Sequence, residues 1–229
     1  MPVLMYHRVS PTGASNTARY RVTPDAFEEQ LAYLREAGYQ SVSVDELTQS
    51  IESRRPLPGR RVLLTFDDGY VDFAEHAWPL LRRYGFGAIL FVVSGCAGGT
   101  NEWDRRLGEE LPLLGWDALR ELQAAGVTIG AHSVTHPPLT GLSPRAVAHE
   151  AAQSRRVIQD ELGAPIQTFA YPFGDRDETV ERVVGACGFT LDFTCRSYLM
   201  HVNDAPLSLP RIEVQGNDDL ATFVRNLTV

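Results

Sequence analysis

The chain carries the sequence RVLLTFDDGY at residues 61–70. The apolar first half predicts a buried β-strand, and the polar second half predicts a loop that holds Asp67 and Asp68 directly after the strand. The sequence VTIGAHSVTH at residues 127–136 has the same form, with a short strand followed by His132 and His136. Each pattern is weak alone, but together they place carboxylates and imidazoles at the ends of two strands.

Two imidazoles and one carboxylate are enough to hold a catalytic divalent metal with coordination positions left open. The second carboxylate then remains free to act as a base. The two stretches therefore predict a hydrolytic reaction that is assisted by a metal.

The rest of the chain alternates between strands and helices. A helix is predicted after Thr23, which can cap it, with Pro24 at its first position. The fully apolar run GAILFVV at residues 87–93 is typical of a central parallel strand covered on both faces. Alternating elements predict about seven parallel β-α units, which either close into a barrel or form an open doubly wound sheet. In both folds, functional groups lie at the carboxyl ends of the strands.

The composition limits the domain organisation and the partners. With 229 residues, 44% of them hydrophobic, the chain can build one full core, and no repeat, low-complexity tract or linker divides it. We therefore expect a single domain over residues 1–229. The net charge of -8 and the pI near 5.2 argue against nucleic acid or an anionic membrane as the main partner.

Cysteine spacing and hydropathy suggest a compartment. Cys96, Cys187 and Cys195 show no C-x2-C spacing and are odd in number, which favours a reducing environment. The first residues lack the features of a signal peptide, and no apolar run approaches a membrane span. We expect a cytoplasmic protein without a membrane span, although an export signal removed from the chain would change this expectation.

Three ordered stretches resemble the first three motifs of the NodB-homology polysaccharide deacetylases: TFDDGY at 65–70, HSVTHP at 132–137 and FAYPFG at 169–174. The resemblance covers nearly the whole chain. It implies an α/β fold, a distorted (β/α) barrel of about seven parallel strands. It also implies a metal-dependent hydrolase that removes N-acetyl groups from an N-acetylhexosamine in a glycan or glycan precursor. Zn²⁺ is the implied metal, with Co²⁺ or Ni²⁺ as alternatives.

The resemblance also implies roles for individual residues. Asp68, His132 and His136 are the expected metal ligands. Asp67 is the expected general base, which takes a proton from the attacking water, and such assistance is worth ~10² to 10⁴ in rate. Two adjacent carboxylates are needed because the base must not bind the metal strongly. The backbone N–H of Phe173 is the expected oxyanion donor.

The chain departs from the family pattern near its C-terminus. It has no Asp-x-x-Asp-Trp and no Leu-x-x-His motif, which would supply the general acid. The poly-N-acetylglucosamine deacetylases of biofilm systems provide that histidine from the first strand, and LMYHRV at residues 4–9 is similar to this permuted arrangement. His7 is therefore the expected general acid, an imidazolium expected to hold its proton at neutral pH near Asp67 and a metal, and His201 is the rival candidate. Ala170 occupies the place of the motif-three arginine, and Arg211 is the expected replacement.

Aromatic residues near the loops are candidates for a sugar site. Tyr70, Tyr171 and Trp103 are expected to stack against the substrate. The expected partner is an N-acetylated sugar or oligosaccharide, and the sequence sets neither the sugar nor the oligomeric state. Three alternatives remain open: hydrolysis of a non-sugar or cyclic amide, cleavage of an O-acetyl ester, or glycan binding without catalysis.

Overall fold

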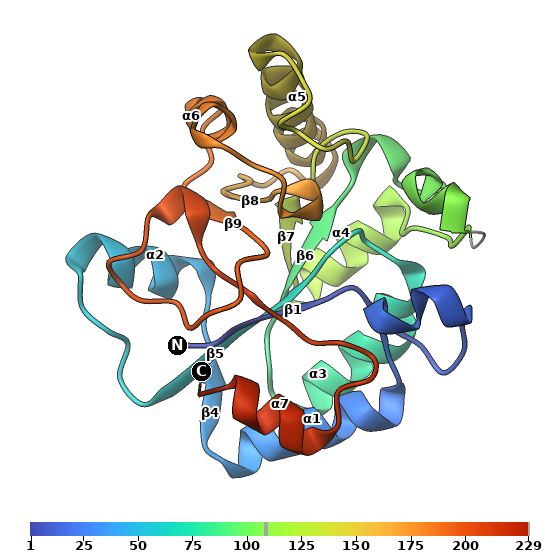
Figure 1. The fold of residues 1–229 in the computed structure, drawn as a ribbon, viewed down its shortest axis with the longest axis vertical. Coiled ribbons are helices and arrows are strands. Elements are labelled where there is room, and N and C mark those ends of the chain that lie inside the picture. Colours follow the sequence, from blue (N-terminus) through green and yellow to red (C-terminus); the bar gives the residue numbers. More distant parts are fainter. Residues whose placement is uncertain (108–109, 229) are drawn as a thin grey trace.

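A curled sheet of parallel strands forms the centre of the molecule (Figure 1), in a computed structural model that describes residues 1–107 and 110–228. Its strands lie in the order β10 (Ile212–Glu213), β1 (Val3–Tyr6), β5 (Arg60–Phe66), β6 (Ile89–Val92), β7 (Thr128–Ala131), β8 (Thr168–Ala170) and β9 (Leu191–Phe193). β4 (Tyr39–Ser41) pairs with the first part of β5. All of these strand pairs are parallel. The expected barrel of about seven parallel strands is confirmed.

The C-terminal strand segment closes the curled sheet. Leu209 exchanges backbone hydrogen bonds with β9 and the residue after it: Thr194 N donates to Leu209 O, and Leu209 N donates to Asp192 O, both at 2.8 Å. Shortly afterwards the same segment becomes β10, which pairs with β1. Residues 209–213 therefore connect β9 to β1 and complete a distorted barrel.

Helices cover the outside of the sheet (Figure 1): α1 (Pro24–Glu36), α2 (Val44–Ser53), α3 (Trp78–Tyr84), α4 (Trp116–Ala124), α5 (Pro144–Leu162), α6 (Glu178–Ala186) and α7 (Leu220–Asn226). Capping side chains explain where the two longest begin. The hydroxyls of Thr23 and Ser143 accept hydrogen bonds from the first turns of α1 and α5, and a proline follows each cap.

Short elements lie in the connections. The helical turns are η1 (Ser15–Tyr20), η2 (Phe73–Ala77), η3 (Ser94–Cys96), η4 (Glu102–Leu107), η5 (Pro172–Gly174) and η6 (Pro206–Ser208). β2 (Arg8–Val9) and β3 (Arg21–Val22) form a separate parallel pair just after β1. This pair holds η1, which lies between its two strands, beside the end of β1.

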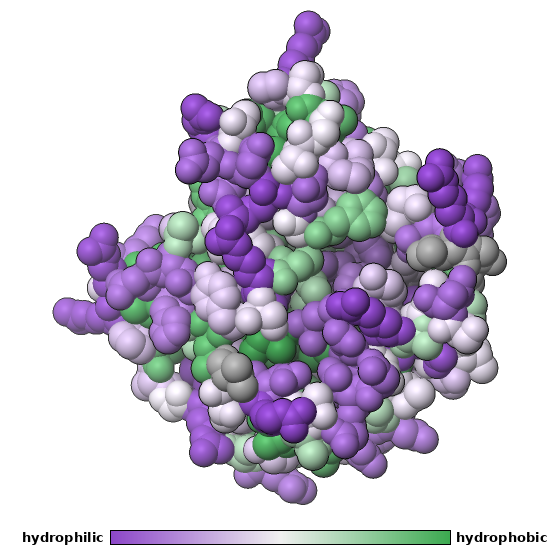
Figure 2. All heavy atoms as spheres, in the orientation of Figure 1, coloured by the Kyte–Doolittle hydropathy of each residue, from purple (hydrophilic) through white to green (hydrophobic). Residues whose placement is uncertain are grey.

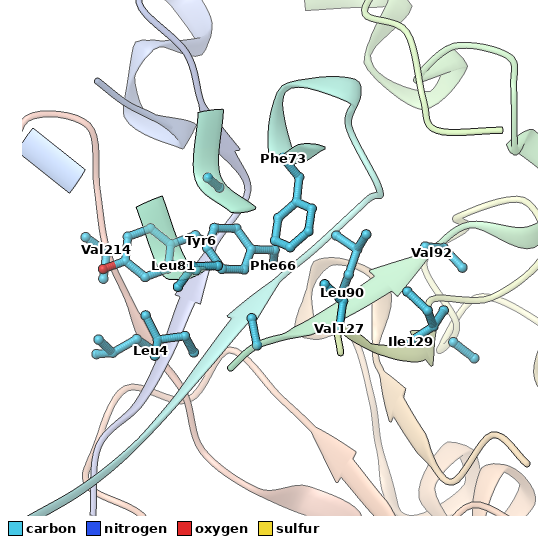
Figure 3. Close-up of a cluster of buried hydrophobic side chains, with 14 of the residues drawn as sticks. Leu4, Tyr6, Phe66, Phe73, Leu81, Leu90, Val92, Val127, Ile129 and Val214 are labelled. Carbon is cyan, nitrogen blue, oxygen red and sulfur yellow. The ribbon is translucent and has the colours of Figure 1, made fainter. Parts of the chain in front are cut away.

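Alternating side chains on the strands produce two hydrophobic layers. On β6, Ile89 and Phe91 belong to an inner cluster, whereas Leu90 and Val92 belong to an outer cluster beneath the helices. Figure 3 shows part of this outer layer, including Leu90 and Val92. Both faces of β6 are therefore buried, as its uninterrupted apolar sequence predicts.

The visible surface is mixed. Figure 2 shows hydrophobic side chains in small groups among hydrophilic ones on the face seen in Figure 1. Among residues 1–107 and 110–228, no helix combines the length and the apolar character that crossing a membrane requires.

Candidate active site

Strand parity brings two candidate catalytic residues into the same space. Val3 of β1 and Leu63 of β5 belong to the inner cluster, so every second residue after them also faces inward. His7 and Asp67 have this parity and follow the ends of these two paired strands, where Asp67 N donates to Tyr6 O at 2.9 Å. Both residues line a cavity of about 490 Å³, which we call the catalytic cavity.

Asp68, His132 and His136 form a cluster that can hold a metal. All three are buried, and one ligand atom from each lies within 4.8 Å of the others. Asp68 Oδ1 lies 3.5 Å from His132 Nε2 and 3.3 Å from His136 Nε2, and the two nitrogens are 3.2 Å apart. This convergence of one carboxylate oxygen and two imidazole nitrogens suits zinc and similar divalent cations.

The surroundings of the cluster fit a cation. Burial lowers the pKa of His132 to about 4 and lowers the pKa of His136 well below its usual value, so both rings are neutral at pH 7. His132 Nδ1 lies 2.7 Å from Ala170 O, and a proton on Nδ1 leaves Nε2 free as a ligand. Burial, followed by the charge of Asp67, raises the pKa of Asp68. Within the described chain Asp68 Oδ1 has no hydrogen-bond partner, and a bound cation would satisfy it.

Unusual backbone conformations concentrate at this cluster. Asp68, Ser133, His136 and Phe173 have φ values between 58° and 74°. In the described ranges, the only other non-glycine residue with positive φ is Arg54, which ends α2. Such a conformation costs of order 1–3 kcal/mol and persists only where the surrounding structure imposes it. Here one such support is local, because Ser133 Oγ accepts a hydrogen bond from His136 N at 2.9 Å.

A buried glutamate on α5 also contacts the loop between the two histidines. Glu150 Oε2 accepts hydrogen bonds from Val134 N at 2.8 Å and Thr135 N at 2.9 Å, and Glu150 Oε1 accepts one from Thr135 Oγ1 at 2.9 Å. Sequence reasoning missed Glu150. No motif marks it, because it lies on a separate helix and meets the loop only in the folded chain.

Arg211 forms a bidentate ion pair with Asp67. Its Nη1 and Nη2 lie 2.6 Å and 2.8 Å from the two carboxylate oxygens, and its Nε donates to Thr194 O at 3.0 Å. Burial alone would raise the pKa of Asp67, but the charge and hydrogen bonds of Arg211 hold it well below its usual value. Asp67 is therefore ionised at neutral pH. The expected replacement arginine lies beside the expected base, and its part in catalysis stays a prediction.

The structure separates the two candidates for the general acid. His7 lines the catalytic cavity, whereas His201 lines a different cavity beside Met1, near the start of β1 rather than its end. Burial lowers the pKa of His7, although the Asp67 charge opposes this effect. Without a metal, the Asp67 charge alone therefore does not keep His7 protonated at neutral pH. Loss of contact with water outweighs the attraction of a carboxylate that Arg211 already neutralises.

Aromatic side chains form two walls of the catalytic cavity. Trp103 of η4 packs against His136, with ring centroids 4.4 Å apart, and Tyr20 of η1 packs against His7 at 5.1 Å. Tyr70 also lines the cavity. Tyr20 was not expected from the sequence, because only the pairing of β2 with β3 brings its turn beside β1.

Tyr171 does not line the cavity, so the expectation that it stacks on a sugar is wrong. Its side chain is fully buried, and its hydroxyl donates to Leu207 O at 2.9 Å. Tyr171 has the same strand parity as Phe169, and both belong to the outer hydrophobic layer. Ala170, between them, faces inward.

Phe173 lies at the edge of the catalytic cavity in the turn η5. Its ring contacts that of His136 at 4.6 Å, and its side chain is 56% exposed. The next residue, Gly174, also has positive φ, and a Cβ there would lie only 2.8 Å from the Cys195 side chain. Glycine is therefore required for the turn to sit this close. The turn lies next to the metal cluster, and the oxyanion role of its amide stays a prediction.

Comparison with protein families identifies a family for the chain. The polysaccharide deacetylase model matches residues 54–191, more than half of the chain. The matched segment contains Asp67 and the three residues of the metal cluster. His7 and Arg211 lie outside it, on either side.

Comparison with individual proteins gives similarity along nearly the whole chain. The poly-beta-1,6-N-acetyl-D-glucosamine N-deacetylase of Escherichia coli (strain K12) is 25% identical over 90% of this chain, which spans 35% of that longer protein. Two solved structures are similar over 100% of this chain. The deacetylase PplD of Streptococcus pyogenes, in complex with acetate, has 26% identity, a TM-score of 0.86 and 98% of its chain covered. IcaB from Ammonifex degensii has 29% identity, a TM-score of 0.85 and 97% of its chain covered.

Proposed function

The chain belongs to the polysaccharide deacetylase family, and from this membership we propose that it removes N-acetyl groups from N-acetylglucosamine units of an oligosaccharide or polysaccharide. The name of the Escherichia coli relative makes β-1,6-linked N-acetylglucosamine oligomers the first substrates to test. We further propose Zn²⁺ as the metal, because one carboxylate and two neutral imidazoles are a common zinc-binding set.

The observation that carries this proposal is the contrast between two adjacent aspartates. Asp68 Oδ1 faces two neutral imidazoles and lacks a hydrogen-bond partner among the described residues. Asp67, the preceding residue, is held by both nitrogens of a guanidinium fork. Asp68 is therefore available to bind a cation, whereas Asp67 is ionised and its charge is balanced by Arg211. Metal-assisted hydrolysis with a separate carboxylate base uses one carboxylate of each kind in the same site.

The metal cluster supplies the electrophilic part of the reaction. Asp68, His132 and His136 would hold the cation by the three atoms that converge in the structure. When bound, the cation supplies Lewis acidity that polarises the amide carbonyl and acidifies the attacking water. In this proposal the Phe173 N–H stabilises the negative charge that develops on the carbonyl oxygen, a contribution worth ~3 to 4 kcal/mol at comparable sites.

Asp67 takes a proton from the attacking water. Arg211 fixes both of its oxygens and keeps it ionised at neutral pH, so the base is ready in the resting site. A carboxylate with a lowered pKa is a weak base and holds the proton only briefly. The proton must therefore pass on during the same catalytic cycle.

His7 protonates the leaving nitrogen. Burial lowers its pKa, so it is neutral before the reaction and must gain its proton during the reaction. We propose that this is the proton that Asp67 removes from water, since the two residues follow neighbouring strand ends and line the same cavity. The protons then balance: water adds its oxygen to the acetyl carbon, one of its protons reaches the leaving nitrogen through Asp67 and His7, and the C–N bond breaks. The second proton stays on the new carboxyl group, and at neutral pH the acetic acid gives it up, so that the products are acetate and the protonated amine.

The walls of the catalytic cavity favour a substrate longer than one sugar. Its volume of about 490 Å³ is within the usual range for small-molecule sites. Trp103 lies on the side of the metal cluster and Tyr20 on the side of His7, so two aromatic rings flank the reacting amide. Sugar rings stack on such faces. We propose that the two neighbours of the reacting unit occupy these two walls.

Acetate release tests the proposal. The substrates are β-1,6-linked N-acetylglucosamine oligomers of one to six units, assayed with added Zn²⁺ or Co²⁺. The control is Asp67→Asn, which is nearly isosteric and should lack the base. We expect release by the wild type only, with longer oligomers favoured. A wild-type protein that binds metal but releases no acetate from any oligomer would refute the assignment.

A further inference from the structure

Glu150 on α5 makes three hydrogen bonds to the loop that carries the metal ligands. Two are donated by the consecutive backbone N–H groups of Val134 and Thr135, at 2.8 Å and 2.9 Å, and the third by the Thr135 hydroxyl at 2.9 Å. The Glu150 residue is 8% exposed. It is therefore a buried acceptor that satisfies two backbone donors at one point of the loop.

These bonds act on a backbone that needs support. The loop runs from His132 to His136, and two of its five residues, Ser133 and His136, have positive φ. Without Glu150 as acceptor, the N–H groups of Val134 and Thr135 would lose their partners. The free energy of the observed loop conformation would then rise relative to that of an extended one. The loop would then no longer present both imidazoles to one point. The ring nitrogens are 3.2 Å apart, so a small rotation of either residue separates them.

We infer that Glu150 is a positioning residue for the metal: it fixes the loop in the conformation that brings His132 and His136 together. This inference rests on the proposed metal-dependent function. Glu150 touches neither imidazole and is not part of the catalytic cavity. It lies in a separate hollow with Thr135, behind the loop. Its effect therefore passes through the backbone, and a substitution there removes nothing from the substrate site.

Three variants and one control isolate this effect. Glu150→Ala removes all three acceptor contacts. Glu150→Gln keeps an amide oxygen for the backbone donors and its NH₂ can donate to the Thr135 hydroxyl, so it retains the geometry without the charge. Thr135→Val removes only the hydroxyl bond, at an exposed residue where folding is not at risk. Glu161→Ala is the matched control, because Glu161 is an exposed glutamate of the same helix that contacts Arg120.

The measurement is Co²⁺ binding to the metal-free full chain, followed by visible absorption and repeated with Zn²⁺ in competition. Loss of a group that orients metal ligands typically weakens binding ~10- to 100-fold. We expect Glu150→Ala to raise the Kd by this factor and to change the intensity of the cobalt spectrum. Glu150→Gln and Thr135→Val should raise the Kd by a smaller factor. Glu161→Ala should match the wild type in both Kd and spectrum.

The outcomes separate the inference from the function on which it rests. A Glu150→Ala protein with the wild-type Kd and cobalt spectrum would overturn the inference and leave the proposed function intact. If this variant does not fold, Glu150→Gln and Thr135→Val decide, and a wild-type Kd in both would also overturn the inference. A wild-type chain that binds no Co²⁺ or Zn²⁺ would overturn the proposed metal-dependent function and this inference together.

Discussion

Replacing Arg211 by methionine tests how the charge of Asp67, the proposed base, is maintained. Arg211 is 0% exposed and Asp67 is 2% exposed, so the pair is shielded from water. Methionine has a similar length and no charge, and it leaves Asp67 buried without its guanidinium partner. Removing one partner of a buried ion pair typically costs about 3–5 kcal/mol in the free energy of unfolding. We expect a loss of this size in denaturant unfolding of the metal-free protein.

The same change should move the pH dependence of catalysis. Arg211 is the group that holds the pKa of Asp67 down, whereas burial acts to raise it. An adjacent arginine lowers a carboxyl pKa by ~1–3 units. Its removal should therefore shift the acid limb of the pH profile of kcat/KM to higher pH by at least that amount. Activity of Arg211→Met at pH 7 should fall and partly recover as the pH rises.

Acetate release across pH 4 to 10, with metal content measured in parallel, checks this expectation. Arg211→Lys is the matched control, because it keeps the charge but loses the planar fork, and it should show a smaller shift. Metal content should remain at the wild-type level in both variants, since Arg211 does not contact the cluster. An Arg211→Met enzyme with the wild-type acid limb would refute the role assigned to this residue.

Four further outcomes are expected. Asp67→Asn should retain bound metal and lose turnover, whereas His132→Ala should lose both; equal metal loss, measured by elemental analysis, would contradict the division of roles. His7→Ala should lower amide cleavage ~10²-fold or more and cleavage of the activated ester 4-nitrophenyl acetate far less, and His201→Ala should change neither; the reverse pattern would exclude His7 as the acid. Because the folded-state pKa of His132 is about 4, below its unfolded value of about 6.5, the unfolded chain binds the proton first. Urea unfolding of the metal-free protein should therefore show stability that is lost as the pH falls from about 6.5 to about 4, by on the order of 3 kcal/mol, and a flat profile would contradict the shift. Tyr20→Ala should lower the ratio of kcat/KM for a tetramer to that for the monomer by about three- to tenfold, whereas Tyr20→Phe should preserve it.

The metal cluster could be predicted from the sequence because Asp68 and His132 closely follow the ends of two strands and His136 lies four residues after His132. A strand that ends at residue 66 or 131 delivers the next side chains to the same end of the barrel, whatever the details of packing. Strand parity was also available. In residues 169–171, alternation along the strand predicts that Phe169 and Tyr171 face outward if Ala170 faces inward. This would have corrected the expectation that Tyr171 contacts a sugar.

Other parts of the site depend on contacts that no local pattern reveals. Glu150 and Tyr20 lie on elements whose sequences contain no recognisable motif. Each is identified only by the residue that it contacts in the folded chain, Thr135 for Glu150 and His7 for Tyr20. The protonation of His7 cannot be predicted from the local sequence for a related reason. Its pKa depends on the balance between burial and two opposite charges, Asp67 and Arg211, and burial exists only in the folded chain.

The closing segment at residues 209–213 also sets an order of events during synthesis. A nascent chain that has emerged only as far as residue 200 already contains Asp68, His132 and His136, the three residues of the metal cluster. It still lacks Arg211, so its Asp67 has no neutralising partner and the sheet has no last strand to join β9 to β1. The Asp67–Arg211 ion pair and the pairing of β10 with β1 can therefore form only after residue 213 has been made. A cut between residues 200 and 209 would likewise separate the three residues of the metal cluster from Arg211, the partner of Asp67.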